Sequence, residues 1–276
     1  MAASEKHWLI TGVSSGLGRA LAAVVLASGD RVSGTVRSPQ DKDLFESGAP
    51  GRAHGYLLDV RDEAAITAMV GALGSIDVLV NNAGFGLVGA IEEASLAEAR
   101  DQFEVNVFGP LRLIQAVLPA MRACGAGVIV NITSVSGLTT WQGTGIYCAS
   151  KFALEAIGDT LADEVATLGI KVMNVEPGGM RTDYVSRSLK RAGQKLDCYD
   201  QTAHASERIL SDHAGHESGD PMKMAGHILD AVRQKAPPRH LLLGADAVHY
   251  ATRKMAALLT EIGEGAAISV DTRFDR

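Results

Sequence analysis

The stretch His7-Trp-Leu-Ile-Thr-Gly-Val-Ser-Ser-Gly-Leu-Gly18 decides the fold class of this 276-residue chain. Its first five residues form a short apolar run that is typical of a buried strand. Three glycines follow at once, and the Ala/Leu/Val-rich residues 19–28 are predicted to be a helix that ends at Gly29. A strand, a glycine turn and a helix in this order bind a pyrophosphate at the helix N-terminus, because glycines let the backbone approach phosphates closely. The spacing is Gly-x-x-x-Gly-x-Gly rather than the general Gly-x-Gly-x-x-Gly, so a glycine-rich turn without a ligand is the alternative.

The rest of the chain alternates apolar runs with helical patterns. Further strands are predicted over residues 31–36, 55–60, 76–81, 128–132, 171–176 and 240–243. Strands that alternate with helices favour a single Rossmann-type doubly wound α/β domain over 1–276, with about seven parallel strands and helices on both faces. The nucleotide-binding half is expected at about 1–130, and the catalytic and substrate half at about 131–276. Residues 180–221 are polar and aperiodic, and we predict that they form a mobile lid.

Composition excludes several classes of protein. The net charge of −6 and the absence of a basic run argue against nucleic-acid binding. Three widely spaced cysteines favour a reducing compartment, and no apolar run reaches the ~18 residues of a membrane span. We therefore expect a cytoplasmic protein without a membrane partner. His213 and His216 are interpreted as part of a solvated loop, and no metal site is predicted.

Three residues in the second half suggest proton transfer. Ser134 follows the predicted strand 128–132, at the carboxyl end where open α/β sheets bind ligands. Tyr147 and Lys151 are four residues apart, which places both on one face of a predicted helix. A phenol with a pKa near ~10 is a poor catalyst at neutral pH, and a nearby ammonium group lowers that pKa. The serine hydroxyl can then hold a substrate oxygen while the tyrosine gives or takes its proton.

The motifs together resemble the classical short-chain dehydrogenase/reductase family over nearly the whole chain. The turn from Thr11 to Gly18, the run Asn81-Asn82-Ala83-Gly84 and the thirteen-residue offset from Ser134 to Tyr147 all match its patterns. The resemblance implies a catalytic tetrad of Asn106, Ser134, Tyr147 and Lys151. In this tetrad Tyr147 is the general acid-base, Ser134 positions the substrate oxygen, Lys151 lowers the pKa of Tyr147 and binds the nicotinamide ribose, and Asn106 holds a water. We also expect a homo-oligomer, either a dimer or a tetramer.

The expected cofactor is NADP(H), with NAD(H) possible. NAD-binding folds place an acid at the end of the second strand to bind the ribose 2′-hydroxyl, but here Val36 stands there and Arg37 follows, as suits a 2′-phosphate. Asp59 matches the residue that meets adenine. The predicted cofactor-binding residues are Gly12, Ser14, Ser15, Gly16, Leu17, Gly18, Arg37, Asp59, Val60, Asn82, Ala83, Gly84, Tyr147, Lys151, Pro177, Gly178 and Thr182.

The expected reaction interconverts a secondary alcohol and a ketone or aldehyde by hydride transfer. The predicted substrate residues are Ser134, Trp141, Gln142, Tyr147, Met180 and Tyr184, and Phe85, Leu138 and Tyr199 are further lining candidates. Because these side chains are uncharged, they favour an uncharged, moderately hydrophobic small molecule. A nucleotide-binding regulator and an epimerase or dehydratase on the same fold are the alternatives. The sequence does not identify the compound or the direction of the reaction.

Overall fold

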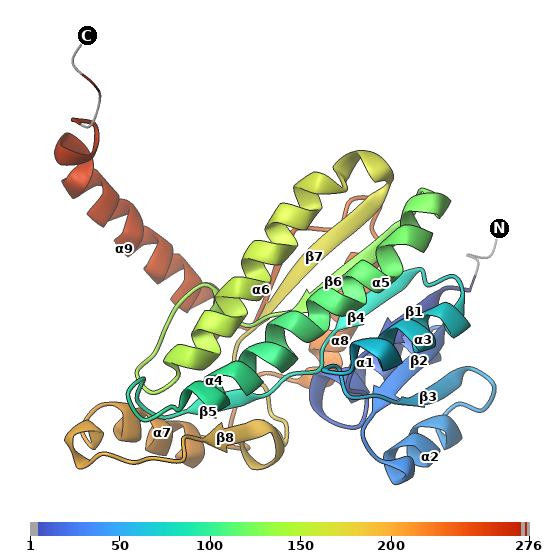
Figure 1. The fold of residues 1–276 in the computed structure, drawn as a ribbon, viewed down its shortest axis with the longest axis horizontal. Coiled ribbons are helices and arrows are strands. Elements are labelled where there is room, and N and C mark those ends of the chain that lie inside the picture. Colours follow the sequence, from blue (N-terminus) through green and yellow to red (C-terminus); the bar gives the residue numbers. More distant parts are fainter. Residues whose placement is uncertain (1–4, 272–273, 275–276) are drawn as a thin grey trace.

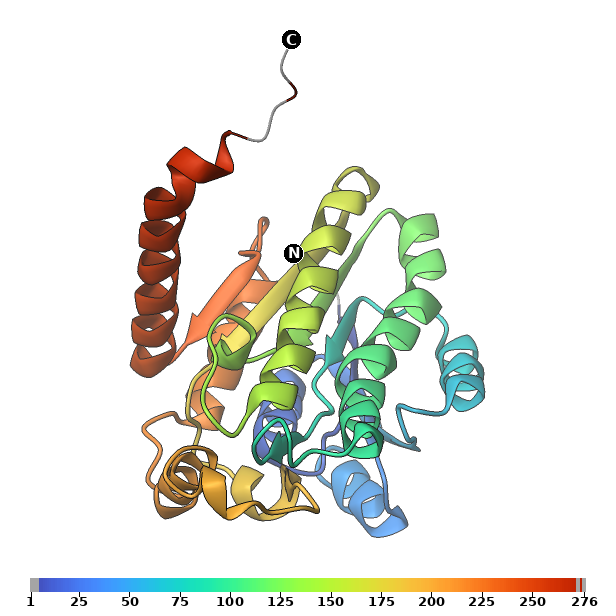
Figure 2. The same ribbon diagram turned by 60° about the vertical axis from the view of Figure 1, so that its left-hand side comes forward.

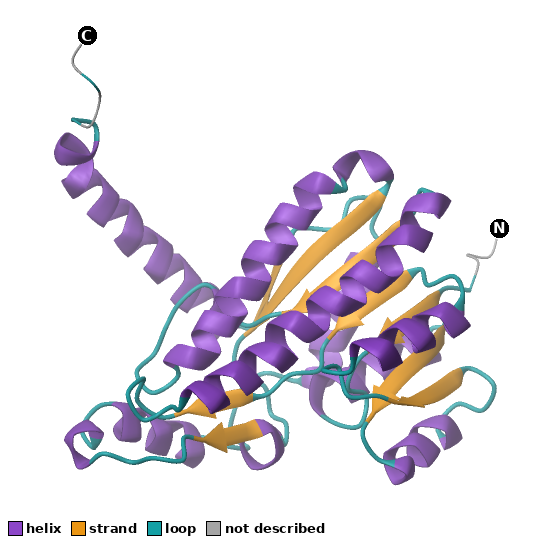
Figure 3. Ribbon diagram, viewed as in Figure 1, coloured by secondary structure: helices purple, strands orange, loops and turns teal. Residues whose placement is uncertain are grey.

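A seven-stranded parallel sheet forms the centre of the molecule (Figures 1 and 3). The computed structural model describes residues 5–271 and 274. In spatial order the strands are β3 (Ala53–Leu57), β2 (Arg31–Val36), β1 (His7–Ile10), β4 (Val78–Asn81), β6 (Gly127–Ile132), β7 (Ile170–Pro177) and β9 (His240–Leu243). The predicted doubly wound fold with seven parallel strands is therefore confirmed. The strand order reverses between β1 and β4, which is where such sheets open a ligand crevice.

Helices cover both faces of the sheet, and alternate strand residues point to each face. One core cluster joins Trp8 and Ile10 to α1 (Gly16–Ala27) and α8 (Pro221–Val232). The other joins Leu9 to α3 (Glu63–Leu73), α5 (Gly109–Cys124) and α6 (Gly145–Glu164). The remaining helices are α2 (Pro39–Ser47), α4 (Leu96–Phe103), α7 (Ala203–Asp212) and α9 (Ala245–Ser269). Burial on both faces explains why the strand sequences are nearly continuous apolar runs.

The segment predicted to be aperiodic, residues 180–221, contains regular structure. Its strand β8 (Leu189–Arg191) pairs in parallel with β5 (Gly86–Val88) and forms a second, two-stranded sheet. Helix α7 follows, and its buried His204 lies 2.7 Å from Glu93 Oε1. Regular elements therefore form although the sequence of this segment is aperiodic, and its role as a lid stays a prediction. Both elements are short and mainly polar, and their partners lie about a hundred residues away in the sequence.

No helix in the described part of the chain is both long enough and apolar enough to cross a membrane.

Candidate active site

The glycine turn between β1 and α1 has a backbone that only small residues allow. Gly12 and Gly16 have φ angles of +73° and +55°, in the left-handed region that favours glycine. A Cβ added to Gly18 would lie 2.3 Å from the Nδ2 atom of Asn82 and 2.3 Å from the carbonyl oxygen of Gly12. The Asn82 amide in turn donates to the carbonyl oxygens of Thr11 (2.8 Å) and Gly12 (3.1 Å). The turn is thus held against the end of β4.

This turn fits a nucleotide pyrophosphate. Ser15 is the N-cap of α1, and its side chain makes no capping hydrogen bond, so the first amides of the helix can donate to an anion. Thr182 lies across the turn, with its Cγ2 atom 3.9 Å from where a Cβ of Gly16 would be. The structure therefore brings the predicted residues Gly12, Ser15, Gly16 and Thr182 together.

The end of β2 carries an exposed cation, Arg37, whose charge also helps to lower the pKa of Asp59. Val36 is buried, whereas Arg37 is exposed and forms no hydrogen bond or ion pair with the described residues. The next residue, Ser38, is the N-cap of α2, and its hydroxyl accepts from the Asp41 amide at 3.1 Å and donates to the Asp41 carboxylate at 2.8 Å. Arg37 is consequently the charged group available to an anion at this position.

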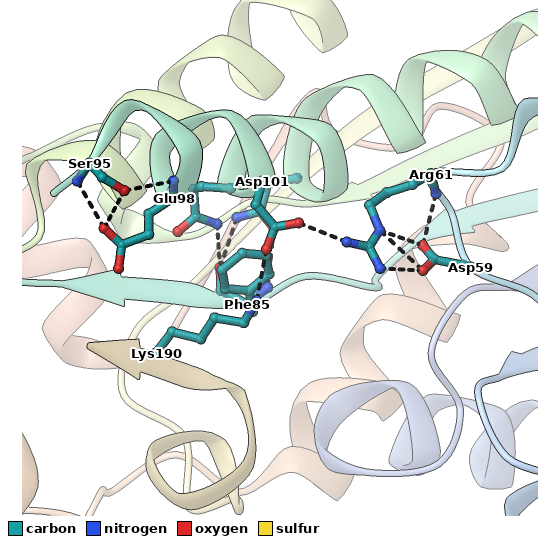
Figure 4. A network of polar contacts seen from close by, with 9 residues as sticks. Asp59, Arg61, Phe85, Ser95, Glu98, Asp101 and Lys190 are labelled. Atoms are coloured by element: carbon teal, nitrogen blue, oxygen red, sulfur yellow. Dashed lines mark hydrogen bonds and ion pairs between the residues drawn. The ribbon is translucent and has the colours of Figure 1, made fainter. Parts of the chain in front are cut away.

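Asp59, predicted to meet adenine, has its carboxylate bound by Arg61 (Figure 4). Arg61 also pairs with Asp101 at 2.8 Å, and Asp101 pairs with Lys190 of β8 at 2.8 Å. These contacts lower the pKa of Asp59, chiefly through the hydrogen bonds from Arg61, and the pKa of Asp101, chiefly through that from Lys190. The Asp59 side chain is therefore engaged within the protein. No local pattern in the sequence predicts this network, because Lys190 lies 89 residues from Asp101.

The predicted catalytic residues converge at the carboxyl end of β6. Ser134 follows this strand, and its hydroxyl accepts from the Ser136 amide at 3.0 Å. On α6, Lys151 is buried, donates from Nζ to the Ile132 carbonyl at 2.9 Å and lies 5.9 Å from the centre of the Tyr147 ring. The side chains of Ser134 and Tyr184 lie near the Tyr147 hydroxyl, and both act to lower its pKa. These contacts place a serine, a tyrosine and a lysine around one point next to the crevice.

Burial has the largest effect on the pKa values of Tyr147 and Lys151. It raises the pKa of the Tyr147 phenol, and the neighbouring side chains of Ser134 and Tyr184 oppose that shift. Burial also lowers the pKa of the Lys151 ammonium to about 8, against the opposing charge of Glu155. The lowering of the tyrosine pKa by Lys151, expected from the sequence, stays a prediction.

Asn106 lies in a π-helical turn, Glu104–Phe108, between α4 and α5. Such turns interrupt helices frequently at functional sites. The side chain of Asn106 accepts from the Phe85 amide at 3.1 Å and donates to the Phe85 carbonyl at 2.9 Å and to Ser150 Oγ at 3.2 Å. A Cβ on Gly84 would lie 3.1 Å from Asn106 Oδ1 and 3.8 Å from Lys151 Nζ. Asn106 thus fixes the backbone beside the lysine.

The predicted substrate residues separate into two groups. Tyr184 is close to the catalytic tyrosine, with its ring centre 6.5 Å from that of Tyr147. Trp141 instead packs edge-on against Tyr250 of α9, with the ring centres 5.6 Å apart, and joins the small core cluster below α9. Met180 packs against the main core cluster, and Gln142 is exposed. The structure therefore gathers Ser134, Tyr147 and Tyr184, whereas the described contacts of Trp141 and Met180 lie with other residues and Gln142 is exposed.

The other lining candidates also have partners of their own. Phe85 lies under Lys190, whose Nζ is 4.1 Å from the ring centre, and Leu138 packs in the cluster below α9. The Tyr199 hydroxyl donates to Glu92 at 2.6 Å. Beyond β7, the Gly179 amide donates to Asp246 of α9 at 2.7 Å, a contact that anchors the predicted Pro177–Gly178 loop and that the sequence did not indicate.

A buried acidic group lies one helical turn beyond Lys151. Glu155 accepts from Asn174 Nδ2 at 2.7 Å, and the fully buried Glu176 lies 2.6 Å from His240 Nδ1. Burial raises the pKa of Glu155 to about 7 and that of Glu176 to about 8. Sequence analysis did not single out these carboxyl groups.

Comparison with known proteins agrees with this geometry. Residues 6–192 match the family model described as short chain dehydrogenase. "Oxidoreductase BOA17" of Botryotinia fuckeliana is 35% identical over 92% of this chain and 94% of that protein. "NADPH-dependent 3-dehydrocapnine reductase" of Ornithobacterium rhinotracheale is 36% identical over 64% of this chain and 66% of that protein.

Solved structures of short-chain dehydrogenases also resemble this chain. The crystal structure of a short-chain dehydrogenase from Streptomyces avermitilis is 40% identical, with a TM-score of 0.93 over 99% of this chain and 100% of that one. A more distant structure, "ElxO with NADP Bound", is 24% identical with a TM-score of 0.73 over 89% of this chain and all of that one, and shares the fold. The chain belongs to the short chain dehydrogenase family of oxidoreductases.

Proposed function

We propose that this oxidoreductase interconverts a secondary alcohol and a ketone or aldehyde with NADP(H), using Tyr147 as the general acid-base. The observation that carries the proposal is the convergence of Ser134, Tyr147 and Lys151 at the carboxyl end of β6. An alcohol or carbonyl oxygen held by the serine hydroxyl would sit within reach of the phenol. That arrangement suits proton transfer to or from the substrate oxygen.

The cofactor would lie across the carboxyl end of the sheet. Gly12, Ser15, Gly16 and Thr182 would surround the pyrophosphate, and Lys151 would bind the nicotinamide ribose. When bound, the nicotinamide accepts or donates the hydride. The guanidinium of Arg37, which forms no hydrogen bond or ion pair with the described residues, supports NADP(H) over NAD(H), because a 2′-phosphate needs a cation where a 2′-hydroxyl needs an acceptor. The name of the Ornithobacterium relative, which includes NADPH, is consistent with this choice.

The proton would travel through Tyr147. In reduction, the phenol gives its proton to the carbonyl oxygen while the Ser134 hydroxyl donates a second hydrogen bond to that oxygen. Lys151, with a pKa of about 8, is mostly protonated at neutral pH, so its charge stabilises the phenolate that forms.

The substrate would enter beside Tyr184, and residues 180–221 would act as the lid. This lid carries β8, whose pairing with β5 brings it next to the backbone that Asn106 holds. The aromatic ring of Tyr184 favours an uncharged substrate with some apolar surface. A lid that also encloses the reaction keeps water away from the hydride.

The test is a screen of uncharged alcohols and ketones with NADPH and NADH, followed by nicotinamide absorbance. Net NADPH turnover that disappears in Tyr147→Phe is the expected result. An epimerase or dehydratase would convert substrate without net cofactor turnover, and a regulator would bind NADPH without converting any compound. Either outcome would overturn the proposal.

A further inference from the structure

The lid, residues 180–221, forms a small layer beside β5 (Figures 1 and 2). After β8 the chain folds over the turn that connects β5 to α4. The Leu196 amide donates to Glu93 Oε1 at 2.6 Å, and the Tyr199 hydroxyl donates to Glu92 at 2.6 Å. Polar contacts with this turn therefore attach the part of the lid that follows β8.

Glu93, at the centre of these contacts, is a carboxylate with almost no access to water. It is 2% exposed, and Oε2 accepts from the Ala90 amide at 2.7 Å. Oε1 accepts from the Leu196 amide and lies 2.7 Å from His204 Nε2. Burial acts to raise the pKa of Glu93, but the two amides and His204 outweigh it and lower that pKa. Glu93 is thus a fixed negative charge inside the protein.

His204, near the start of α7, lies between two carboxylates. It is 3% exposed, with Nε2 2.7 Å from Glu93 and Nδ1 2.7 Å from Asp200 Oδ1. A neutral imidazole has one N–H group and one lone pair, so it can donate to one of these oxygens and sets its lone pair against the other. Both contacts are favourable when His204 is protonated. The lid as it lies here therefore holds a proton.

The charged groups around His204 favour this protonated form. Hydrogen bonds with Asp200 and Glu93 raise the pKa of His204 above its ordinary value of 6.5, against the effects of burial and of the Lys195 charge. His204 in turn lowers the pKa of Asp200, with help from the charges of Lys195 and Arg208. Arg208 also donates to the Asp200 carbonyl at 2.8 Å, which ties this cation of α7 to the same group.

We propose that His204 is a proton-dependent latch, which fixes the lid against Glu93 when protonated and releases it when neutral. The proposal rests on the proposed function for the role of residues 180–221 as a lid. Loss of the proton leaves a buried carboxylate oxygen without its donor, which favours an open arrangement in which water reaches that oxygen. Apolar packing would hold the lid at every pH, whereas a histidine makes the contact reversible near neutral pH.

The latch lies beside the loop that leads to the catalytic tyrosine. A Cβ added to Gly143 would lie 2.8 Å from the carbonyl oxygen of Ala203, the residue before His204. The Gly143 carbonyl also accepts from the Gly89 amide at 2.9 Å. Tyr147 follows in the first turn of α6. Release of the latch therefore removes a contact from the loop that precedes Tyr147.

Proton linkage gives the direction of the pH dependence. In an open lid the His204 side chain is hydrated and titrates near 6.5, whereas in the closed lid its pKa is raised. The contribution of the latch to closure is complete below 6.5 and is lost as the pH rises through the raised value. Between the two values, the equilibrium constant for closure should fall about tenfold per pH unit.

Hydrogen exchange of the full chain, measured by mass spectrometry from about pH 6 to about pH 9, tests the latch without substrate or cofactor. Protection factors, which correct for the intrinsic exchange rate at each pH, should fall with rising pH over residues 196–206 of the wild type. In His204→Gln they should be about tenfold lower at the acidic end and independent of pH. The matched control His213→Gln, at the exposed C-terminal end of α7, should follow the wild type.

Asp200→Asn tests the same proton without changing a buried side chain. The Asp200 side chain is 48% exposed, and the amide oxygen that replaces its carboxylate can still accept from Nδ1. Because the charge beside the imidazole is lost, the fall in protection should move to lower pH by about one unit. The control Asp197→Asn makes the same charge change in the turn Asp197–Tyr199 and should leave the midpoint where it is.

Turnover supplies a second readout. The KM of the wild type for its substrate should rise toward that of H204Q as the pH increases, whereas a merely structural role would change KM by the same factor at every pH. Wild-type protection over 196–206 that does not depend on pH, or a shift in D197N as large as that in D200N, would overturn the latch. The expected exchange pattern in a protein without NADPH turnover would support the latch and overturn the proposed function alone.

Discussion

Replacing Glu176 by Gln should make the protein more stable in alkaline solution. Glu176 is fully buried at the end of β7, and its carboxyl lies 2.6 Å from His240 Nδ1. Burial raises its pKa from 4.5 to about 8, so the folded chain keeps a proton that the unfolded chain has already released. The free energy of unfolding therefore falls as the pH rises from 4.5 toward about 8. At higher pH Glu176 is ionised in both the folded and the unfolded chain, so its effect on stability no longer changes with pH.

The structure gives the scale of the effect. One pKa unit corresponds to about 1.4 kcal/mol, so the shift of Glu176 sets an upper limit of roughly 5 kcal/mol. Relaxation of the protein around a buried charge makes the real effect smaller than this limit. At pH values above the folded pKa, we expect Glu176→Gln to raise the free energy of unfolding by ~2 kcal/mol. Near the pKa of Glu176 in the unfolded chain, the protonated Glu176 of the folded wild type and the Gln that replaces it are both neutral and similar in shape. The free energies of unfolding of the two proteins should therefore differ little at that pH.

Urea denaturation of both proteins across this pH range measures the difference directly. The exposed Glu164, at the end of the same helix as Glu155, supplies the control Glu164→Gln, which should follow the wild type at every pH. A difference between wild type and E176Q that stays constant from acid to alkaline pH would refute the reasoning, because no proton uptake would then be linked to folding at this residue.

The remaining expectations concern catalysis and cofactor choice. Tyr147→Phe keeps the ring but removes the proton, so turnover should fall by ~10² or more while a fluorescence titration shows nearly unchanged NADPH binding. A variant within a few-fold of wild type would exclude Tyr147 as the acid. Lys151→Met should weaken both turnover and NADPH binding, and any remaining activity should have its pH optimum at higher pH, as pH–rate profiles would show. Arg37→Ala should raise the KM for NADPH by roughly tenfold to a hundredfold with little change for NADH. Equal losses for both cofactors would instead indicate a general role in binding.

The sequence predicted most of the sheet and the centre of the site for a physical reason. Strands buried on both faces, such as β6, must be apolar along their whole length, and that pattern is visible locally. The four-residue spacing of Tyr147 and Lys151 also depends only on helix geometry. In contrast, the pairing of β5 with β8 depends on contacts between distant segments. The direction of Trp141 could not be predicted either, because it depends on where α9 begins and which side of it faces the body.

The two-stranded sheet of β5 and β8 has a consequence for how this protein could be redesigned. The strands are joined in register from Gly86 with Leu189 to Val88 with Arg191 through backbone groups. Backbone bonding places few demands on side-chain identity, so residues 192–220 form a module between this anchor and α8 that can be exchanged together with its contact partners, such as Glu93, which holds the buried His204. Exchanging that module for the corresponding segment of a relative, with β8 retained, should transfer substrate preference and leave the cofactor site unaltered. Selection could diversify the same module without rebuilding the catalytic centre.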